Sequence, residues 1–163
     1  MIRWNAVFPT FLTRAFLPSL RKTSLSHPVL VVFNGALSAE LPMPLTPLYA
    51  ASKAFIRHLP SCLSADEKFA AGKSNIEFMY VHTGAVQSNT VTAPANLLRP
   101  TSDEYAAHIV KTLGSGRVEV VPYIGHRIEL AILRGLPTFL LKRVSKEEAK
   151  RLLSMKAKRS KNA

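Results

Sequence analysis

Three short apolar runs divide the chain, and their composition predicts β-strands. They cover 28–33, 75–82 and 118–123 and are rich in Val, Ile, Phe and Tyr. The first run, Pro28-Val29-Leu30-Val31-Val32-Phe33, is apolar throughout, as in a strand buried on both faces of a parallel sheet. Because segments with helical spacing separate the runs, we predict an α/β fold with about three parallel strands.

Apolar residues at helical spacing predict two helices beside the first strand. In residues 1–22 the apolar stripe consists of Leu12, Ala15, Phe16 and Leu20. A second helix is predicted from 49 to about 63, where Pro60 should kink or end it. The polar stretch 64–74 that follows is predicted to be a linker.

Further helices are predicted in the second half of the chain. Thr101 and Glu104 have the spacing of a capping box and predict a helix to about 113, which Gly114 and Gly116 end. A bent apolar helix is predicted over 128–141. A second capping box, Ser145 with Glu148, predicts the start of a basic terminal helix. We therefore predict a domain over 1–141 and a basic helix or tail over 142–163.

Composition narrows the class of protein. A length of 163 residues with 47% apolar composition fits one globular domain. Cys62 is the only cysteine, which excludes an internal disulfide and a cysteine metal cluster, and no metal site is predicted. No apolar run reaches the roughly 18 residues of a membrane-spanning helix.

The net charge of +12 is concentrated at the end of the chain. Residues 142–161 hold nine Lys or Arg against two Glu, a surplus of seven positive charges. Such a segment can contact an anionic membrane surface or nucleic acid. Aromatic residues are not interleaved with the charges and no groove-reading motif is present, so nucleic acid is the less favoured partner.

The most informative chemical pattern is the pair Tyr49 and Lys53, which lies one helical turn apart on one face. A free phenol titrates near ~10. A lysine ammonium beside a phenol favours the phenolate, which makes the phenol a better proton donor to a carbonyl that is being reduced. The spacing alone also fits an ordinary amphipathic helix with one aromatic residue and one solvated lysine.

The surrounding residues make the pattern more specific. The stretch Tyr49-Ala50-Ala51-Ser52-Lys53-Ala54 resembles the opening of the active-site helix in the short-chain dehydrogenase/reductase family. The loop Leu41-Pro42-Met43-Pro44-Leu45 is similar to that of the membrane-associated 3-ketoacyl-CoA reductases and 17β-hydroxysteroid dehydrogenases. The resemblance implies a Rossmann-like fold, a nicotinamide cofactor and a ketone substrate, with Tyr49 as the acid and Lys53 as its partner and a cofactor contact.

The resemblance also implies two further catalytic positions. Asn5 followed by Leu17-Pro18 reproduces the spacing of a family Asn that begins a helix ending in Leu-Pro, so Asn5 is expected in a proton relay; a simple N-cap is the alternative. This match favours a core helix, although residues 1–22 lack acids, as mitochondrial targeting peptides do. The family serine thirteen residues before the tyrosine is replaced by Ala36, and Ser38 is the nearest hydroxyl that could hold the carbonyl.

The segment after the second predicted strand resembles the family's cofactor contact Pro-Gly-x-Val-x-Thr. Gly84 and Val86 match it, Ser88 can replace the threonine, and Thr83 stands where the family has proline. These four residues, with Tyr49 and Lys53, are the expected cofactor-binding set. His82 is expected to be an ordinary strand-end histidine, because no other ligand type clusters with it.

The Gly-rich turn that binds pyrophosphate in dinucleotide-binding folds is not found among the seven glycines. We therefore expect only the active-site half of a Rossmann-like sheet, weak or absent NADP binding, and an unpaired edge on the strand at 28–33. By resemblance, the helices after Asn5 and Tyr49 are expected to form a homo-oligomer.

Two functional interpretations remain open on the sequence, with a third at the tail. The first is an NAD(P)H-dependent ketoreductase that acts on 3-ketoacyl-CoA or a steroid-like ketone. The second is a non-catalytic dimerisation or membrane-surface remnant, or an incomplete gene model of such an enzyme. The third is a basic adaptor that uses 142–161. Association with the endoplasmic reticulum membrane is expected by resemblance, with a cytoplasmic location as the alternative.

Overall fold

A parallel sheet forms the centre of the fold. The structure is a computed structural model that describes residues 1–71, 75–89 and 91–161. Its strands are β1 (Val29–Asn34), β2 (Ile76–Val81) and β3 (Glu119–Val120), in the order β1-β2-β3. The register pairs Val29 with Ile76 through to Asn34 with Val81, so the carboxyl ends of the strands meet at one edge of the sheet. The predicted α/β fold with a partial Rossmann-like sheet of three parallel strands is confirmed.

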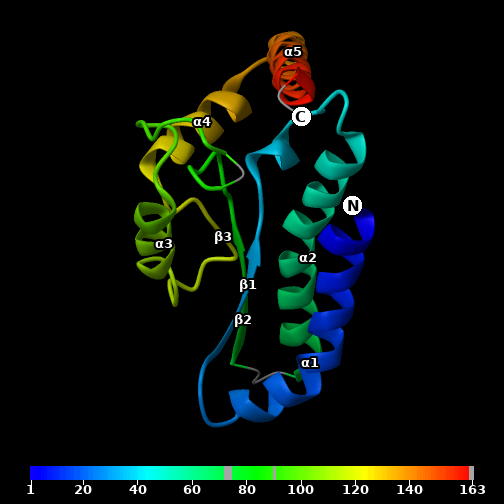
Figure 1. Ribbon diagram of the computed structural model, residues 1–163. Coiled ribbons are helices and arrows are strands. Elements are labelled where there is room, and N and C mark those ends of the chain that lie inside the picture. The colour runs from blue at the N-terminus through cyan, green and yellow to red at the C-terminus, as the bar shows by residue number, and fades with distance from the viewer. Residues whose placement is uncertain (72–74, 90, 162–163) are drawn as a thin grey trace.

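Helices cover both faces of this sheet (Figure 1). The π-helical turn η1 (Arg3–Val7) continues into α1 (Phe8–Ser24), and both pack beside α2 (Pro47–Ala71) on one face. Here Phe78 and Tyr80 of β2 are buried against Ile56 of α2. On the other face, α3 (Ser102–Val110) packs through Tyr105 against Met79 and Val81. This alternation along β2 follows from the two-residue period of a strand.

Both long helices on the first face continue past a proline. α2 runs through Pro60 to Ala71, so the predicted end near 63 and the linker at 64–74 are wrong over the described part of that stretch. α1 likewise passes Pro18, where an end was expected. Proline inside a helix costs about 3 kcal/mol. Burial of the apolar faces of both helices against β1 and β2 offsets that cost.

The carboxyl-terminal helices begin elsewhere than predicted. α4 (Ile124–Gly135) and α5 (Thr138–Lys161) meet at Leu136, which is extended because a residue before proline disfavours helix. Ser145 therefore lies inside α5 and does not begin it; its Oγ donates to the carbonyl of Leu141 at 2.9 Å. The Thr101 cap is as predicted, since its hydroxyl accepts from the Glu104 N–H at 3.2 Å. The division of the chain at 141 stays a prediction.

β1 lies at the edge of the sheet, and within the described residues it pairs only with β2. The short turn η2 (Leu37–Glu40) follows it and leads the chain over the carboxyl ends of the strands (Figure 1). No helix in the described parts of the chain is both long enough and apolar enough to cross a membrane. The edge formed by Asn34, Val81 and Val120 is where the candidate site lies.

Candidate active site

A cleft of about 290 Å³ lies beyond the carboxyl ends of β1 and β2. Ser38 of η2, Tyr49 of α2, and Thr83 and Gly84 after β2 all line it. α4 and α5 contribute the remaining wall. In open parallel sheets, ligands bind outside the carboxyl ends of the strands. The structure thus brings four of the residues singled out in the sequence to one cavity.

Tyr49 and Lys53 share one face of α2, as the spacing predicts. The Lys53 ammonium lies 5.8 Å from the centre of the Tyr49 ring and donates to the carbonyl of Asn34 at 3.3 Å. Burial lowers the pKa of Lys53 from its usual range, because desolvation disfavours the charged form. The bond to Asn34 holds the lysine at the carboxyl end of β1, one helical turn along α2 from Tyr49.

Ser38 carries an unsatisfied buried hydroxyl. Its Oγ is inaccessible to solvent and has no hydrogen-bond partner in the described part of the chain. Ala36, which occupies the family's serine position, is held through its backbone instead: its N–H donates to the Tyr80 hydroxyl at 3.0 Å, and that hydroxyl donates to the Ala36 carbonyl at 3.3 Å. Buried polar groups are nearly always paired, so this unpaired hydroxyl is unusual. It meets a ligand oxygen in the cleft only when the Ser38 side chain turns out of the wall.

The loop after β2 is fixed by hydrogen bonds of its own. Thr83 Oγ1 donates to Asn34 Oδ1 at 2.7 Å and accepts from the Tyr105 hydroxyl at 3.0 Å. The Gly84 N–H donates to Nδ1 of His126 at 3.3 Å. His126 Nε2 lies 3.1 Å from the carbonyl of Ala85, so the neutral tautomer with a proton on Nε2 satisfies both contacts. Burial lowers the pKa of His126, which favours that neutral form.

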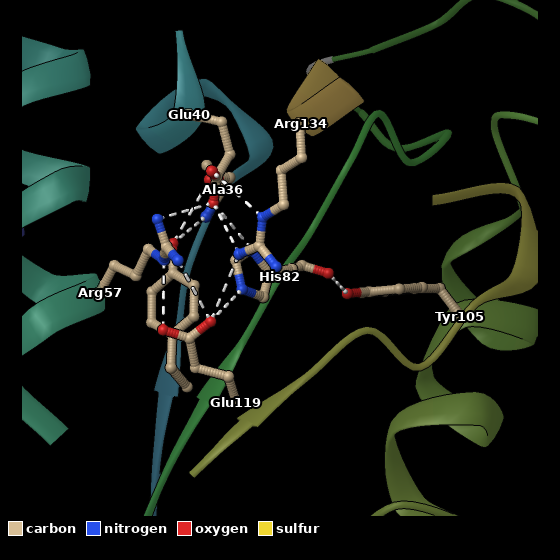
Figure 2. Close-up of polar contacts among 8 residues, drawn as sticks. Ala36, Glu40, Arg57, His82, Tyr105, Glu119 and Arg134 are labelled. Atoms are coloured by element: carbon tan, nitrogen blue, oxygen red, sulfur yellow. Dashed lines mark hydrogen bonds and ion pairs between the residues drawn. The ribbon is translucent and has the colours of Figure 1, made fainter. Parts of the chain in front are cut away.

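A cluster of charged residues lies beside the cleft, and sequence reasoning did not find it (Figure 2). The Arg57 guanidinium bridges Glu40 at 3.0 Å and Glu119 at 3.2 Å, and Arg134 reaches the same two carboxylates at 3.3 and 3.5 Å. His82 is buried between these carboxylates, with Nε2 3.0 Å from Glu119 Oε2. The five residues come from η2, α2, the end of β2, β3 and α4.

The two titratable partners in this cluster are shifted by different causes. Burial lowers the pKa of His82 and outweighs the opposite effect of Glu119 and Glu40. For Glu119, burial alone would raise the pKa, but the bonds from His82 and Arg57 together lower it. His82 directly follows β2, as expected, but the expectation that no acid lies beside it is wrong. Its Nε2 bonds Glu119, whereas its Nδ1 lies 3.8 Å from Glu40 and has no hydrogen-bond partner among the described residues. Within the described residues, no group of three or more His, Cys, Asp or Glu side chains is arranged so that it could hold a metal ion.

Comparison with known proteins identifies the fold. The chain is 26% identical over 157 residues to "Putative steroid dehydrogenase 1" of Caenorhabditis elegans, covering 94% of this chain and 47% of that protein. A solved 7β-hydroxysteroid dehydrogenase aligns over 93% of this chain and 56% of its own, with TM-score 0.64 and 15% identity. A "putative short-chain dehydrogenase" from Novosphingobium aromaticivorans aligns over 91% and 55%, with TM-score 0.54 and 17% identity. Over the aligned part, the chain has the fold of these two solved dehydrogenases.

The chain spans about half the length of these relatives. No family model matches it. The prediction of a very-long-chain 3-ketoacyl-CoA reductase branch stays a prediction, because none of these relatives is described as such an enzyme.

Lys53 does not line the cleft, and neither do the remaining expected site residues. Asn5 lies half-exposed in η1, where that turn packs on α2. Val86 packs beside Met79 and the other residues beneath α3. Ser88 is exposed, and its Oγ accepts from the Val91 N–H at 3.3 Å. Their catalytic or cofactor roles stay predictions.

Proposed function

We propose that this chain carries the active-site half of an NAD(P)H-dependent ketoreductase. The observation that supports it best is the shared cleft: Tyr49 and Ser38 both line one cavity, and the Ser38 hydroxyl, buried in the wall, has no partner among the described residues. A ketone oxygen needs a proton donor and a hydrogen-bond donor while charge develops on it. These two side chains supply both requirements from separate elements, α2 and η2.

In the proposed reaction, each residue has a defined task. Tyr49 donates its phenolic proton to the carbonyl oxygen. Ser38 donates a hydrogen bond to the same oxygen as negative charge grows on it. The Lys53 ammonium stabilises the phenolate that Tyr49 becomes. Ser38 thus replaces, two positions later, the serine that the resembled family places at Ala36.

A reduced nicotinamide cofactor supplies the hydride in this chemistry when it is bound. Lys53 fits its ribose hydroxyls, since one of the three ammonium protons is engaged with Asn34 and the others remain as donors. Thr83 and Gly84 already bond Asn34 and His126, so their task is to shape the loop that the nicotinamide would contact. We propose weak binding of NADP, because the chain has no Gly-rich turn for the pyrophosphate.

The test is turnover of a steroid-like ketone, followed by consumption of NADPH, with NADPH binding measured separately by equilibrium dialysis. Tyr49→Phe removes the proton donor and should lower kcat about 10²–10⁴-fold. Ser38→Ala removes the hydrogen bond to the oxyanion and should lower kcat about 10²–10³-fold. Neither change should alter NADPH binding by a comparable factor.

Tyr123→Phe is the matched control, because Tyr123 is a buried tyrosine outside the cleft lining. This variant should retain wild-type turnover. Equal turnover in the wild type and in Tyr49→Phe would refute the assignment of the acid. If the wild type shows no turnover at an NADPH concentration that saturates binding in the dialysis experiment, the non-catalytic interpretation is favoured.

An exposed apolar surface favours a second role as a dimerisation unit. Aromatic side chains on η1 and α1 are half or more exposed: Trp4, Phe8, Phe11 and Phe16. A groove of about 400 Å³ lies between this segment and α2, where Leu48 and Phe55 also reach the surface. Exposed apolar patches of this kind mark interaction sites. We propose that a second copy of the chain covers it.

Sedimentation velocity with Phe11→Glu tests this role. Phe11 is 62% exposed and lines the groove, so a carboxylate there should shift the chain to monomer. Phe69→Glu is the control, since Phe69 is 95% exposed on α2 and does not line the groove. If Phe11→Glu sediments like the wild type, as the Phe69→Glu control should, this surface is excluded as the interface.

The basic stretch 142–161 is proposed to contact an anionic membrane surface. In α5, Glu147 pairs with Lys150 at 2.7 Å and Glu148 with Arg151 at 3.3 Å, so both acids are engaged within the helix. The surplus of seven positive charges then attracts anionic lipid, at about 1 kcal/mol per residue near the surface. Association with the endoplasmic reticulum is an extension of this proposal. Unchanged binding to anionic vesicles after removal of 142–161 would exclude it.

A further inference from the structure

The wall of the cleft formed by α4 is held in place at both ends of the helix. Near its start, His126 contacts Gly84 and Ala85 of the loop after β2. At its end, Arg134 bonds Glu40 of η2 at 3.3 Å. Glu129 lies between these anchors, three residues after His126 and therefore on the same helix face. It lines the cavity that Ser38 and Tyr49 also line.

The Glu129 carboxylate has no hydrogen bond or ion pair with any residue that the structure describes. It is half-buried, and burial together with the nearby Glu148 carboxylate raises its pKa, against a smaller lowering effect of Arg151. Glu148 itself pairs with Arg151 at 3.3 Å on α5, so the single guanidinium of this wall is already engaged. The wall thus offers one free hydrogen-bond acceptor, with a net charge of one negative when both glutamates are ionised.

The remainder of the lining limits what this acceptor can bind. Apolar side chains from η2, the following loop, α4 and α5 surround it: Leu37, Leu41, Met43, Leu133 and Val144. A carboxylate or phosphate of a ligand would meet two glutamates here. A ligand ammonium would lose its hydration among apolar groups and lie near Arg151. A hydroxyl group loses less on burial and satisfies the free carboxylate.

We propose that Glu129 is a specificity-determining residue that accepts a hydrogen bond from a hydroxyl group of the ketone substrate. The cleft then prefers an uncharged hydroxyketone over a ketone that carries an acidic group at the same position. This inference rests on the proposed ketoreductase function.

The test measures binding to the full chain without cofactor, by isothermal titration calorimetry. The probes are decalone, a hydroxydecalone with its hydroxyl on the ring that lacks the ketone, and the matching carboxydecalone and aminodecalone. The wild type should bind hydroxydecalone about tenfold more tightly than decalone, which corresponds to one added hydrogen bond to a charged group. Carboxydecalone should bind more weakly than decalone.

Glu129→Leu should abolish the tenfold preference for the hydroxyl while leaving decalone affinity within about twofold. Glu129→Gln keeps the shape and an acceptor, and should retain a preference of about threefold. Glu147→Leu is the control, because it removes the same charge from an exposed position of α5 that does not line the cleft. This control should behave as the wild type.

Several results would overturn the inference. Equal affinity for decalone and hydroxydecalone in the wild type would remove it, as would an unchanged preference in both Glu129 variants. Tighter binding of carboxydecalone would assign the wall to anions through Arg151, and tighter binding of aminodecalone would assign it to cations. If no probe binds, both this inference and the proposed function are rejected. If Tyr49→Phe loses turnover but the wild type shows no preference for the hydroxyl group, the inference alone is rejected.

Discussion

Replacing Tyr80 by Phe tests how the fold holds the turn that carries Ser38. Tyr80 lies at the centre of β2, fully buried, and its hydroxyl accepts from the Ala36 N–H at 3.0 Å and donates to the Ala36 carbonyl at 3.3 Å. Burial raises the pKa of Tyr80 to about 12, so the hydroxyl keeps its proton at neutral pH. Gly35 has no room for a side chain, because an added Cβ would collide with the Tyr80 ring.

The magnitude follows from the groups left unpaired. Phe keeps the ring and its packing, so the change removes only the two hydrogen bonds. The Ala36 N–H is buried and would have no partner, which costs about 1–3 kcal/mol. Phe also avoids the desolvation cost of burying the Tyr80 hydroxyl, which offsets a fraction of that loss. We expect the free energy of unfolding to fall by about 2 kcal/mol.

Urea unfolding measures this change directly. With a slope of about 2 kcal/mol per molar urea, the midpoint should fall by about 1 M. Amide hydrogen exchange should also show faster exchange at Ala36. Tyr123→Phe is the matched control, because the Tyr123 hydroxyl forms no hydrogen bond within the described residues and its loss should change the midpoint little. Equal midpoints for the wild type and Tyr80→Phe, with unchanged exchange at Ala36, would refute the reasoning.

Two further predictions concern the charged groups around the sheet. His82 and His126 have lowered pKa values in the folded chain, so the unfolded chain binds more protons than the folded chain in mildly acidic solution. The free energy of unfolding should therefore fall as the pH falls below about 6.5, by up to about 1.4 kcal/mol per pH unit for each histidine. Urea midpoints that do not decrease between pH 7 and about 5.5 would contradict this prediction. Arg57→Met should lower the free energy of unfolding by about 1–3 kcal/mol, because Glu40 and Glu119 lose a shared guanidinium that is 31% exposed and Arg134 compensates only in part. A midpoint in urea equal to that of the wild type would show that the cluster contributes no net stability.

Features that depend only on residues close together in the sequence could be predicted from it. The apolar runs located β1 and β2 within one residue, because β-branched and aromatic residues favour strands. The expected burial of the first run on both faces is wrong: β1 is an edge strand, and Val32 is 42% exposed. The separation of Tyr49 and Lys53 by four residues fixes both on one face of a helix, whatever surrounds them. The Thr101 cap is equally local. Each of these predictions depends on residues within one or two helical turns.

Tertiary packing decided the features that the sequence reasoning missed. The proline rule applies to an isolated helix, and Pro60 lies where α2 is packed against the sheet, so the helix continues to Ala71. The capping pattern at Ser145 is satisfied inside a helix, where the serine hydroxyl donates to the carbonyl four residues earlier. Neither residue differs in type from one that ends or begins a helix; only its neighbours in space differ.

The charged cluster and His126 show why the cleft wall could not be derived from local patterns. Glu40 and Arg134 are 94 residues apart, and only the parallel order of the strands and the return of α4 over η2 bring them together. The ion pair between Arg134 and Glu40 fixes the carboxyl end of α4. A tilt of α4 that separated this pair would also strain the contacts of His126 near the start of the helix. Because one end holds the turn with Ser38 and the other holds the loop with Gly84, the position of Glu129 in the cleft is coupled to both sides of the reacting centre. Specificity and chemistry in this cleft therefore depend on the same few long-range contacts.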